Sequence, residues 1–155
     1  MKSNYFIIPV LVFLVAYMGV IFTSTGIDSG WYEMITKPSF TPTGSFIGLV
    51  WTVIFILMIL SALIFFNSKF SKRKFWIVSI IFFLNGLVNI FWSWLFFKNG
   101  FLGLAFFDAL IIEATVLMLI VLIWRVSKVA SILLIPYSLW VIFASYLNFV
   151  IWQLN

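Results

Sequence analysis

The chain has 155 residues, of which 65% are hydrophobic and 8% are charged, and its formal net charge is +5. A soluble globular domain usually carries about 25% charged residues, so this composition excludes one. The sequence contains no cysteine and no histidine, which excludes disulfide bonds, thiolate or imidazole ligation of zinc or haem iron, and a Ser-His-Asp nucleophile. We therefore expect an integral membrane protein without a metal or a cofactor.

Five apolar stretches are long enough to cross a bilayer, which takes about 20 helical residues. We predict an all-α membrane protein, a single domain of five transmembrane helices over residues 1–155 with a structured loop between the first two. The predicted helices cover approximately residues 5–25, 44–67, 75–97, 101–125 and 129–153. The first stretch is longer than the core of a signal peptide, and no A-x-A-like cleavage site follows it. We interpret it as a retained helix.

The basic residues predict the orientation in the membrane. One side of the predicted bundle carries seven of them and the other carries two. The larger group is Lys2, Lys69, Lys72, Arg73, Lys74, Arg125 and Lys128, and the smaller is Lys37 and Lys98. Because cytoplasmic loops are enriched in Lys and Arg, we expect the N-terminus in the cytoplasm and the first loop outside. The charge also suits contact with anionic lipids of the bilayer, and we expect no nucleic-acid partner.

The first loop is the most informative segment. Residues 31–51 read WYEMITKPSFTPTGSFIGLVW, a stretch with a Trp-Tyr pair, a Lys-Pro step and a second proline. Pro38 and Pro42 forbid a continuous helix, because proline has no backbone N–H and a fixed φ. We expect an irregular segment that folds over the end of the bundle and covers something.

Two predicted helices carry stripes that mix bulky rings with small residues at helical spacing, which places each stripe on one face. The stripes are Gly44, Gly48, Trp51 and Phe55 on the second helix, and Trp140, Ala144, Asn148 and Trp152 on the fifth. Small residues allow helices to pack closely, but beside a large ring they also leave space for a ligand. The spacing alone leaves both interpretations open.

Polar residues within the spans pose a similar choice. Asn85, Asn89 and Ser93 recur at intervals of four on the third helix, and an amide in hydrocarbon costs free energy unless it is paired. This row therefore serves either interhelical hydrogen bonding or the polar lining of a cavity. Asp108 and Glu113 lie roughly 140° apart on the fourth helix, which argues against a paired acid/base site. Each is either structural or recognises a cationic group.

Several spaced motifs follow in order from the first loop to the C-terminus. They are Trp31-Tyr32, Lys37-Pro38-Ser39, Pro42 and Trp51; then Asn89, Trp92-Ser93 and Phe96-Phe97; then Trp124-Arg125-Val126-Ser127, Pro136-Tyr137, Trp140, Phe143-Ala144, Leu147-Asn148 and Ile151-Trp152. In these motifs the chain resembles the TspO/MBR family, the tryptophan-rich sensory proteins related to the mitochondrial translocator protein (peripheral benzodiazepine receptor). The resemblance implies a five-helix bundle, often a homodimer, in a bacterial cell membrane, with a ligand pocket between helices near the first loop.

The resemblance also implies ligands and pocket residues. Family ligands are porphyrins and other tetrapyrroles, sterols, and synthetic translocator-protein drugs of the isoquinoline carboxamide or benzodiazepine type. Carried over by motif, the pocket residues are Tyr32, Pro42, Trp51, Phe55, Asn89, Trp140, Ala144 and Leu147. Sterol recognition through the C-terminal motif of animal members is not expected, because Phe149 and Gln153 stand where that motif has a tyrosine and a basic residue.

Two functions need no conventional catalytic group. The first is a membrane receptor in which Trp51 and Trp140 stack on a porphyrin-like ligand, while Tyr32 and Asn89 contact its polar edge. The second is light- and oxygen-dependent breakdown of bound porphyrin, in which Trp51 or Trp140 acts as the catalytic residue and donates an electron to the excited macrocycle. We favour the receptor.

A third possibility is transport of porphyrin or sterol across the bilayer. The sequence shows no convincing internal repeat, so it offers no support for an inverted-repeat transporter. We also expect a homodimer, and we predict that Asn85, Gly86 and Asn89 on the third helix form its interface.

Overall fold

The structure is a computed structural model that describes residues 3–155, so Lys2, on which part of the predicted orientation rests, lies outside it. The described residues form helices and no strands. The long helices are α1 (Asn4–Asp28), α3 (Gly44–Phe66), α4 (Lys72–Ser93), α5 (Leu102–Trp124) and α7 (Ile135–Leu154). Three short elements are α2 (Trp31–Met34), the π-helix η1 (Trp94–Lys98) that extends α4, and α6 (Lys128–Ile132) before α7. The prediction of an all-α protein with five long apolar helices is confirmed.

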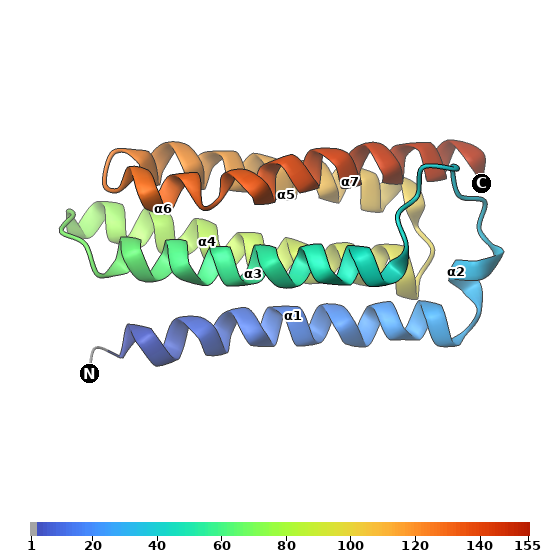
Figure 1. Ribbon diagram of the computed structural model, residues 1–155, viewed down its shortest axis with the longest axis horizontal. Helices are drawn as coiled ribbons and strands as arrows, with labels where there is room; N and C mark the ends of the chain where they lie inside the picture. Colours follow the sequence, from blue (N-terminus) through green and yellow to red (C-terminus); the bar gives the residue numbers. More distant parts are fainter. Residues whose placement is uncertain (1–2) are drawn as a thin grey trace.

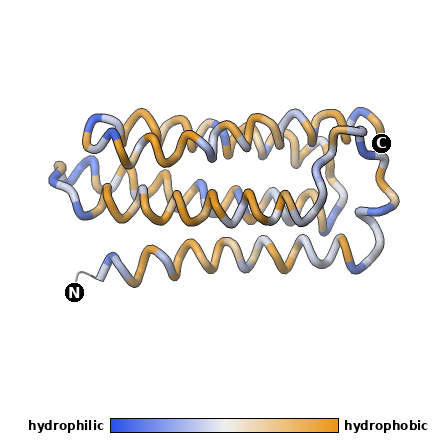
Figure 2. Tube along the Cα trace, in the orientation of Figure 1, coloured by the Kyte–Doolittle hydropathy of each residue, from blue (hydrophilic) through white to orange (hydrophobic). Residues whose placement is uncertain are grey.

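The long helices run side by side along the long axis of the molecule (Figure 1). In this view α1 lies along one edge, α3 and α4 in the middle, and α5 and α7 along the opposite edge. Hydrophobic residues fill the length of the helices and hydrophilic ones gather toward the two ends (Figure 2). Five helical segments are long and apolar enough to cross a membrane. The chain is therefore an integral membrane protein.

The two ends of the bundle carry different connections. The α3–α4 and α5–α6 connections lie at the end where α1 begins (Figure 1), and most of the described basic residues lie in these connections or in the first turns of α4 and α6 that follow them. We call this the basic end. The segment with α2 crosses the opposite end, which we call the loop end, and the C-terminus lies there too (Figure 1).

The structure differs from the predicted helices at three places. The predicted helix over residues 129–153 is interrupted by a turn at Leu133 and Leu134. Pro136 stands in the first turn of α7, where its missing N–H breaks no helical bond. The third predicted helix ends as the wider π-helix η1. The first loop is not wholly irregular, because residues 31–34 form one helical turn.

The prediction of a dimer interface at Asn85, Gly86 and Asn89 was wrong, because all three are buried inside the chain. The Asn85 amide donates to Thr115 Oγ1 of α5 at 2.9 Å. A Cβ added to Gly86 would lie 3.1 Å from the side chain of Val15 in α1. The amides find their partners within the bundle, so this face of α4 is not free to meet a second copy.

Candidate functional site

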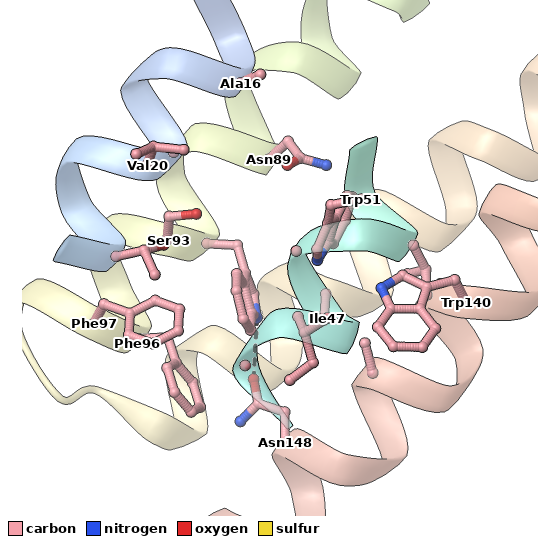
Figure 3. A pocket seen from close by; sticks show the side chains of 18 of the residues that line it. Ala16, Val20, Ile47, Trp51, Asn89, Ser93, Phe96, Phe97, Trp140 and Asn148 are labelled. Atoms are coloured by element: carbon pink, nitrogen blue, oxygen red, sulfur yellow. Dashed lines mark hydrogen bonds between the residues drawn. The ribbon is translucent and has the colours of Figure 1, made fainter. Parts of the chain in front are cut away.

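A cavity of about 340 Å³ lies between the helices in the loop half of the bundle. All five long helices contribute to its wall, as do Tyr32 of α2 and two residues of η1, Phe96 and Phe97. Its lining is mainly apolar, with a few polar groups such as those of Asn89, Ser93 and Asn148. This is the usual composition of a small-molecule site, in which an apolar wall carries a few placed polar groups. Figure 3 shows it from close by.

On α3 the cavity exists because small residues adjoin large ones. Gly44, Gly48, Trp51 and Phe55 all line it. A Cβ added to Gly44 or Gly48 would meet nothing within 4 Å, so neither glycine serves close helix contact. The glycines of this stripe therefore leave space beside the rings of Trp51 and Phe55 and do not mediate close helix packing.

In the α7 stripe, three residues line the cavity and the fourth packs against a neighbouring helix. Trp140, Ala144 and Asn148 line the cavity, whereas Trp152 does not. A Cβ added to Gly103 of α5 would lie only 2.8 Å from the Trp152 ring. Trp152 therefore packs on α5, and here the small residue does allow close helix contact.

The structure brings most of the predicted pocket residues together. Seven of the eight line the cavity, namely Tyr32, Trp51, Phe55, Asn89, Trp140, Ala144 and Leu147. Pro42 is not among the lining residues; it lies in the non-helical segment between α2 and α3, two residues before α3 begins. Whether these residues bind a ligand stays a prediction.

Trp51 and Trp140 lie on one side of the cavity, across from Phe96 and Phe97 (Figure 3). The Trp51 ring meets Tyr137 edge-on, with centroids 5.9 Å apart. The Trp140 Nε1 atom is buried and has no hydrogen-bond partner among the residues that the structure describes. An unpaired buried donor costs about 1–3 kcal/mol, so an acceptor supplied by a bound molecule would remove that cost.

Asn89 combines the two roles that its spacing left open. Its amide donates to the hydroxyl of Tyr137 at 2.6 Å, and that hydroxyl donates to Asn85 Oδ1 at 3.2 Å. Asn89 is thus held in place by interhelical hydrogen bonds while it also lines the cavity. Asn85 serves helix contact alone, because it is not part of the lining.

The prediction missed an aromatic wall on α4 and η1. Trp92 and Phe96 stack with centroids 5.1 Å apart, and both line the cavity together with Phe97. The indole N–H of Trp92 donates to Asn148 Oδ1 at 3.1 Å, and the Asn148 amide donates to the backbone carbonyl of Leu102 at 2.9 Å. These bonds fix the plane of the Trp92 ring. The position of Trp92 well inside its span was a usable signal, but two consecutive lining residues, Phe96 and Phe97, do not follow from regular helical spacing.

The first loop covers this end through aromatic contacts. Trp31 meets Phe96 edge-on at 5.6 Å between ring centroids, and Tyr32 tilts against Phe97 at 5.5 Å. Burial, and secondarily the negative charge of Glu33, raise the pKa of Tyr32 above its ordinary value. The Tyr32 hydroxyl therefore stays neutral at physiological pH, where it can donate a hydrogen bond.

Polar contacts hold the same loop down. The side chain of Asn155 accepts from the backbone N–H of Thr36 at 2.9 Å and donates to its carbonyl at 3.0 Å. Lys37 donates to the carbonyls of Tyr32 and Ile35, and its Nζ lies 4.5 Å from the centroid of the Tyr32 ring. The loop is thus tied to the C-terminal end of α7 as well as folded on itself.

The two acids within the spans do not form a paired site. Glu113 accepts a hydrogen bond from Ser138 of α7. Asp108 lies seven residues before Thr115, which meets Asn85 of α4, so helical spacing turns Asp108 toward α4. Neither acid lines the cavity. Their buried oxygens Asp108 Oδ2 and Glu113 Oε2 have no partner within residues 3–155.

Comparison with known proteins agrees with the fold and the motifs. The model of the TspO/MBR family matches residues 7–153. The chain is 40% identical over 150 residues to the tryptophan-rich protein TspO of Bacillus cereus, with 94% of this chain and 95% of that protein covered. It is 36% identical over 146 residues to the TspO protein of Archaeoglobus fulgidus, covering 93% and 92% of the two chains. It is 27% identical over 127 residues to the human translocator protein, covering 81% and 75%. The chain belongs to the TspO/MBR family.

Proposed function

We propose that the cavity binds a flat, mostly apolar ligand, a porphyrin or another tetrapyrrole, and that the protein acts as a membrane receptor for it. The observation that carries this proposal is Trp140. Its ring lines an apolar cavity, and its buried Nε1 has no acceptor among the described residues. A macrocycle with carboxylate side chains would supply both a planar face for the ring and an acceptor for the N–H.

The arrangement of rings supports a planar ligand. Trp51 and Phe55 come from α3, Trp140 from α7, and Trp92 and Phe96 from α4 and η1. Aromatic pairs contribute about 0.5–1.5 kcal/mol each beyond the area they bury, so contacts from several helices would add to a useful affinity. Synthetic isoquinoline carboxamides and benzodiazepines also carry planar aromatic rings and a carbonyl acceptor, and the proposal extends to them.

The test replaces Trp51 and Trp140 together by phenylalanine and titrates the purified protein with protoporphyrin IX, followed by porphyrin absorbance. Loss of one hydrogen bond costs about 0.5–1.5 kcal/mol, and the smaller rings cover less of the ligand. We expect affinity to fall about fivefold or more. The matched control is Trp76→Phe with Trp124→Phe, which changes two exposed rings at the basic end and should leave affinity unchanged. Unchanged affinity in the first variant would remove the cavity from the binding reaction.

A second candidate function is photochemical breakdown of the bound porphyrin. The observation that favours it is that Trp51 and Trp140 both line the cavity, so either indole would touch the macrocycle. On illumination the indole would give one electron to the excited porphyrin, and dioxygen would be the final oxidant. The test compares the products formed in light by the wild type, by the Trp51→Phe, Trp140→Phe variant, and by porphyrin in detergent alone. Identical products in all three would exclude this function.

We also propose that the basic end faces the cytoplasm and the loop end faces outward in a bacterial cell membrane. The supporting observation is the distribution of the described basic residues, with Lys37 and Lys98 at the loop end and the rest at the other. Because the chain lacks cysteine, single substitutions Ser45→Cys and Ser71→Cys can report the two ends. A membrane-impermeant maleimide added to intact cells should label Cys at position 45 alone. Labelling only at position 71 would reverse the orientation. A homodimer stays a prediction.

A further inference from the structure

Part of the wall of the loop-end cavity lies on the outside of the bundle. Five lining residues are also exposed at the surface, and all of them belong to α1 or α3. They are Val20 and Ile27 of α1, and Gly44, Gly48 and Thr52 of α3. The exposed fractions of Val20 and Ile27 are 60% and 50%. A residue that both lines a cavity and is exposed borders an opening. We call this place the α1–α3 opening.

The exposed strip of α3 lies on the flank that faces α1. Gly44, Gly48 and Thr52 follow one another at intervals of four, so they form one strip along the helix. Ser61 lies nine residues after Thr52, half a turn around the helix at ~3.6 residues per turn, and it bonds to Ala130 of α6. The strip therefore faces away from α6. A Cβ added to either glycine would meet nothing within 4 Å, so α1 leaves the strip uncovered.

The same two helices are in contact in the basic half of the bundle. The Asn4 side chain of α1 donates to the carbonyl of Phe66 in α3 at 3.3 Å, and Val12 belongs to the main buried core. In the loop half α1 packs on η1 instead. A Cβ added to Gly26 would lie only 2.6 Å from the carbonyl oxygen of Phe97. The opening thus lies where α1 packs on η1 and leaves α3 uncovered.

The opening faces the hydrocarbon of one leaflet. Residues 44–52 extend about 12 Å along the helix axis, and the hydrocarbon of one leaflet is about 15 Å thick. No charged side chain within residues 3–155 lines the cavity. From the water side, the segment with α2 covers the cavity through the contacts of Trp31 and Tyr32 with η1. The bilayer therefore has the more open access.

We propose that the ligand enters and leaves the cavity through the α1–α3 opening, from the leaflet at the loop end. This inference rests on the proposed function and names the source of its ligand, a molecule dissolved in the bilayer and not in water. The segment with α2 joins the ends of α1 and α3. Its hydrogen bonds to Asn155 therefore also limit how far the two helices can part.

The test links the two sides of the opening. Because the chain lacks cysteine, Val20→Cys with Thr52→Cys can be joined by a reducible bis-methanethiosulfonate in liposomes. Protoporphyrin IX added before or after linking then reports release and entry. We expect the link to slow both rates about tenfold or more, which corresponds to about 1.4 kcal/mol on the barrier, with affinity unchanged. Reduction should restore both rates. The matched control, Asn4→Cys with Asn67→Cys, links the same helices at the basic end and should change neither rate.

A second readout needs no porphyrin. A phenyldiazirine dissolved in the bilayer forms a carbene on illumination, which inserts into nearby C–H bonds. It should label Leu147, a buried residue of the cavity wall, in the reduced Val20→Cys, Thr52→Cys variant and far less in the linked one. Ile142, exposed on the outside of α7, should be labelled equally in both.

The two readouts separate this proposal from the proposed function. The proposal fails if the link across the opening changes neither the porphyrin rates nor the labelling of Leu147. It also fails if the link at the basic end has the same effect. If the reduced protein binds no porphyrin while the labelling changes as expected, the proposed ligand is wrong and the route from the bilayer is supported.

Discussion

The two ends of this bundle are both rich in aromatic residues, yet one is solid and the other is hollow. At the basic end Phe65 and Phe70 stack with centroids 4.5 Å apart and planes 5° apart, and Phe65 is completely buried. At the loop end the rings of α3 stand beside Gly44 and Gly48, which have nothing near their missing side chains. The size of the residue next to each ring, and not the number of rings, decides whether a cavity forms.

The ends also differ in how they are closed. At the basic end Ser61 Oγ donates to the backbone carbonyl of Ala130 at 2.6 Å, inside a packed core. At the loop end the covering segment is fastened by the side chain of Asn155 and by Tyr32 and Trp31 against η1. We therefore expect the tightly packed basic end to contribute most of the stability of the bundle. At the loop end, only a few contacts hold the segment that contains α2 over the cavity.

The largest expected effect is a loss of stability, and the prediction compares the replacement of two phenylalanines of α3. Phe65→Ala removes a fully buried ring from the solid end and should lower stability by about 3–5 kcal/mol. Phe55→Ala removes a half-buried ring that already borders a cavity and should cost much less. Thermal unfolding in detergent, followed by circular dichroism, measures both. Equal losses would show that the loop end is packed as tightly as the basic end.

The next prediction fills the cavity. Gly48→Leu places a side chain where a Cβ meets nothing within 4 Å, so the protein should fold, and removing a helical glycine should add up to about 1 kcal/mol of stability. Overpacking costs about 1–3 kcal/mol, and here that cost arises only when a ligand enters. Porphyrin affinity should therefore fall about 5- to 150-fold. Gly48→Ala is the matched control and should bind nearly as wild type. Wild-type affinity in the leucine variant would contradict the cavity as the site.

The smallest expected effect concerns the segment that contains α2 and closes the loop end. Asn155→Ala removes both side-chain hydrogen bonds to Thr36. Both are exposed to water, so we expect the pair together to contribute about 0.5–1.5 kcal/mol. The ligand should leave faster, by about 2- to 10-fold, with a smaller change in stability. Stopped-flow dilution of the porphyrin complex gives the dissociation rate. Asn67→Ala is the control, because the Asn67 amide bonds only within the basic end, to the carbonyl of Leu63. A dissociation rate that Asn155→Ala leaves unchanged would mean that the loop does not limit ligand release.

Hydropathy was sufficient to predict the five spans, and helical spacing placed the stripes of α3 and α7 on single faces. Helical spacing could not predict whether the polar row Asn85, Asn89 and Ser93 faces the inside of the bundle or a second copy. An amide such as that of Asn85 can form its hydrogen bonds in either place. Helical spacing also could not predict the π-helix η1. It lies where Gly26 of α1 comes close to the carbonyl of Phe97, a tertiary contact that no local pattern reveals. Pro42 entered the predicted pocket by motif, and motif does not specify which side of the loop faces the cavity.

The most direct test of the central claim is a crystal structure with zinc protoporphyrin IX, in which the anomalous signal of the zinc locates the ligand. The account predicts a single strong peak inside the bundle, between Trp51 and Trp140 on one side and Phe96 on the other, beneath the segment that contains α2. A peak confined to the outer surface, with the cavity unchanged, would contradict it.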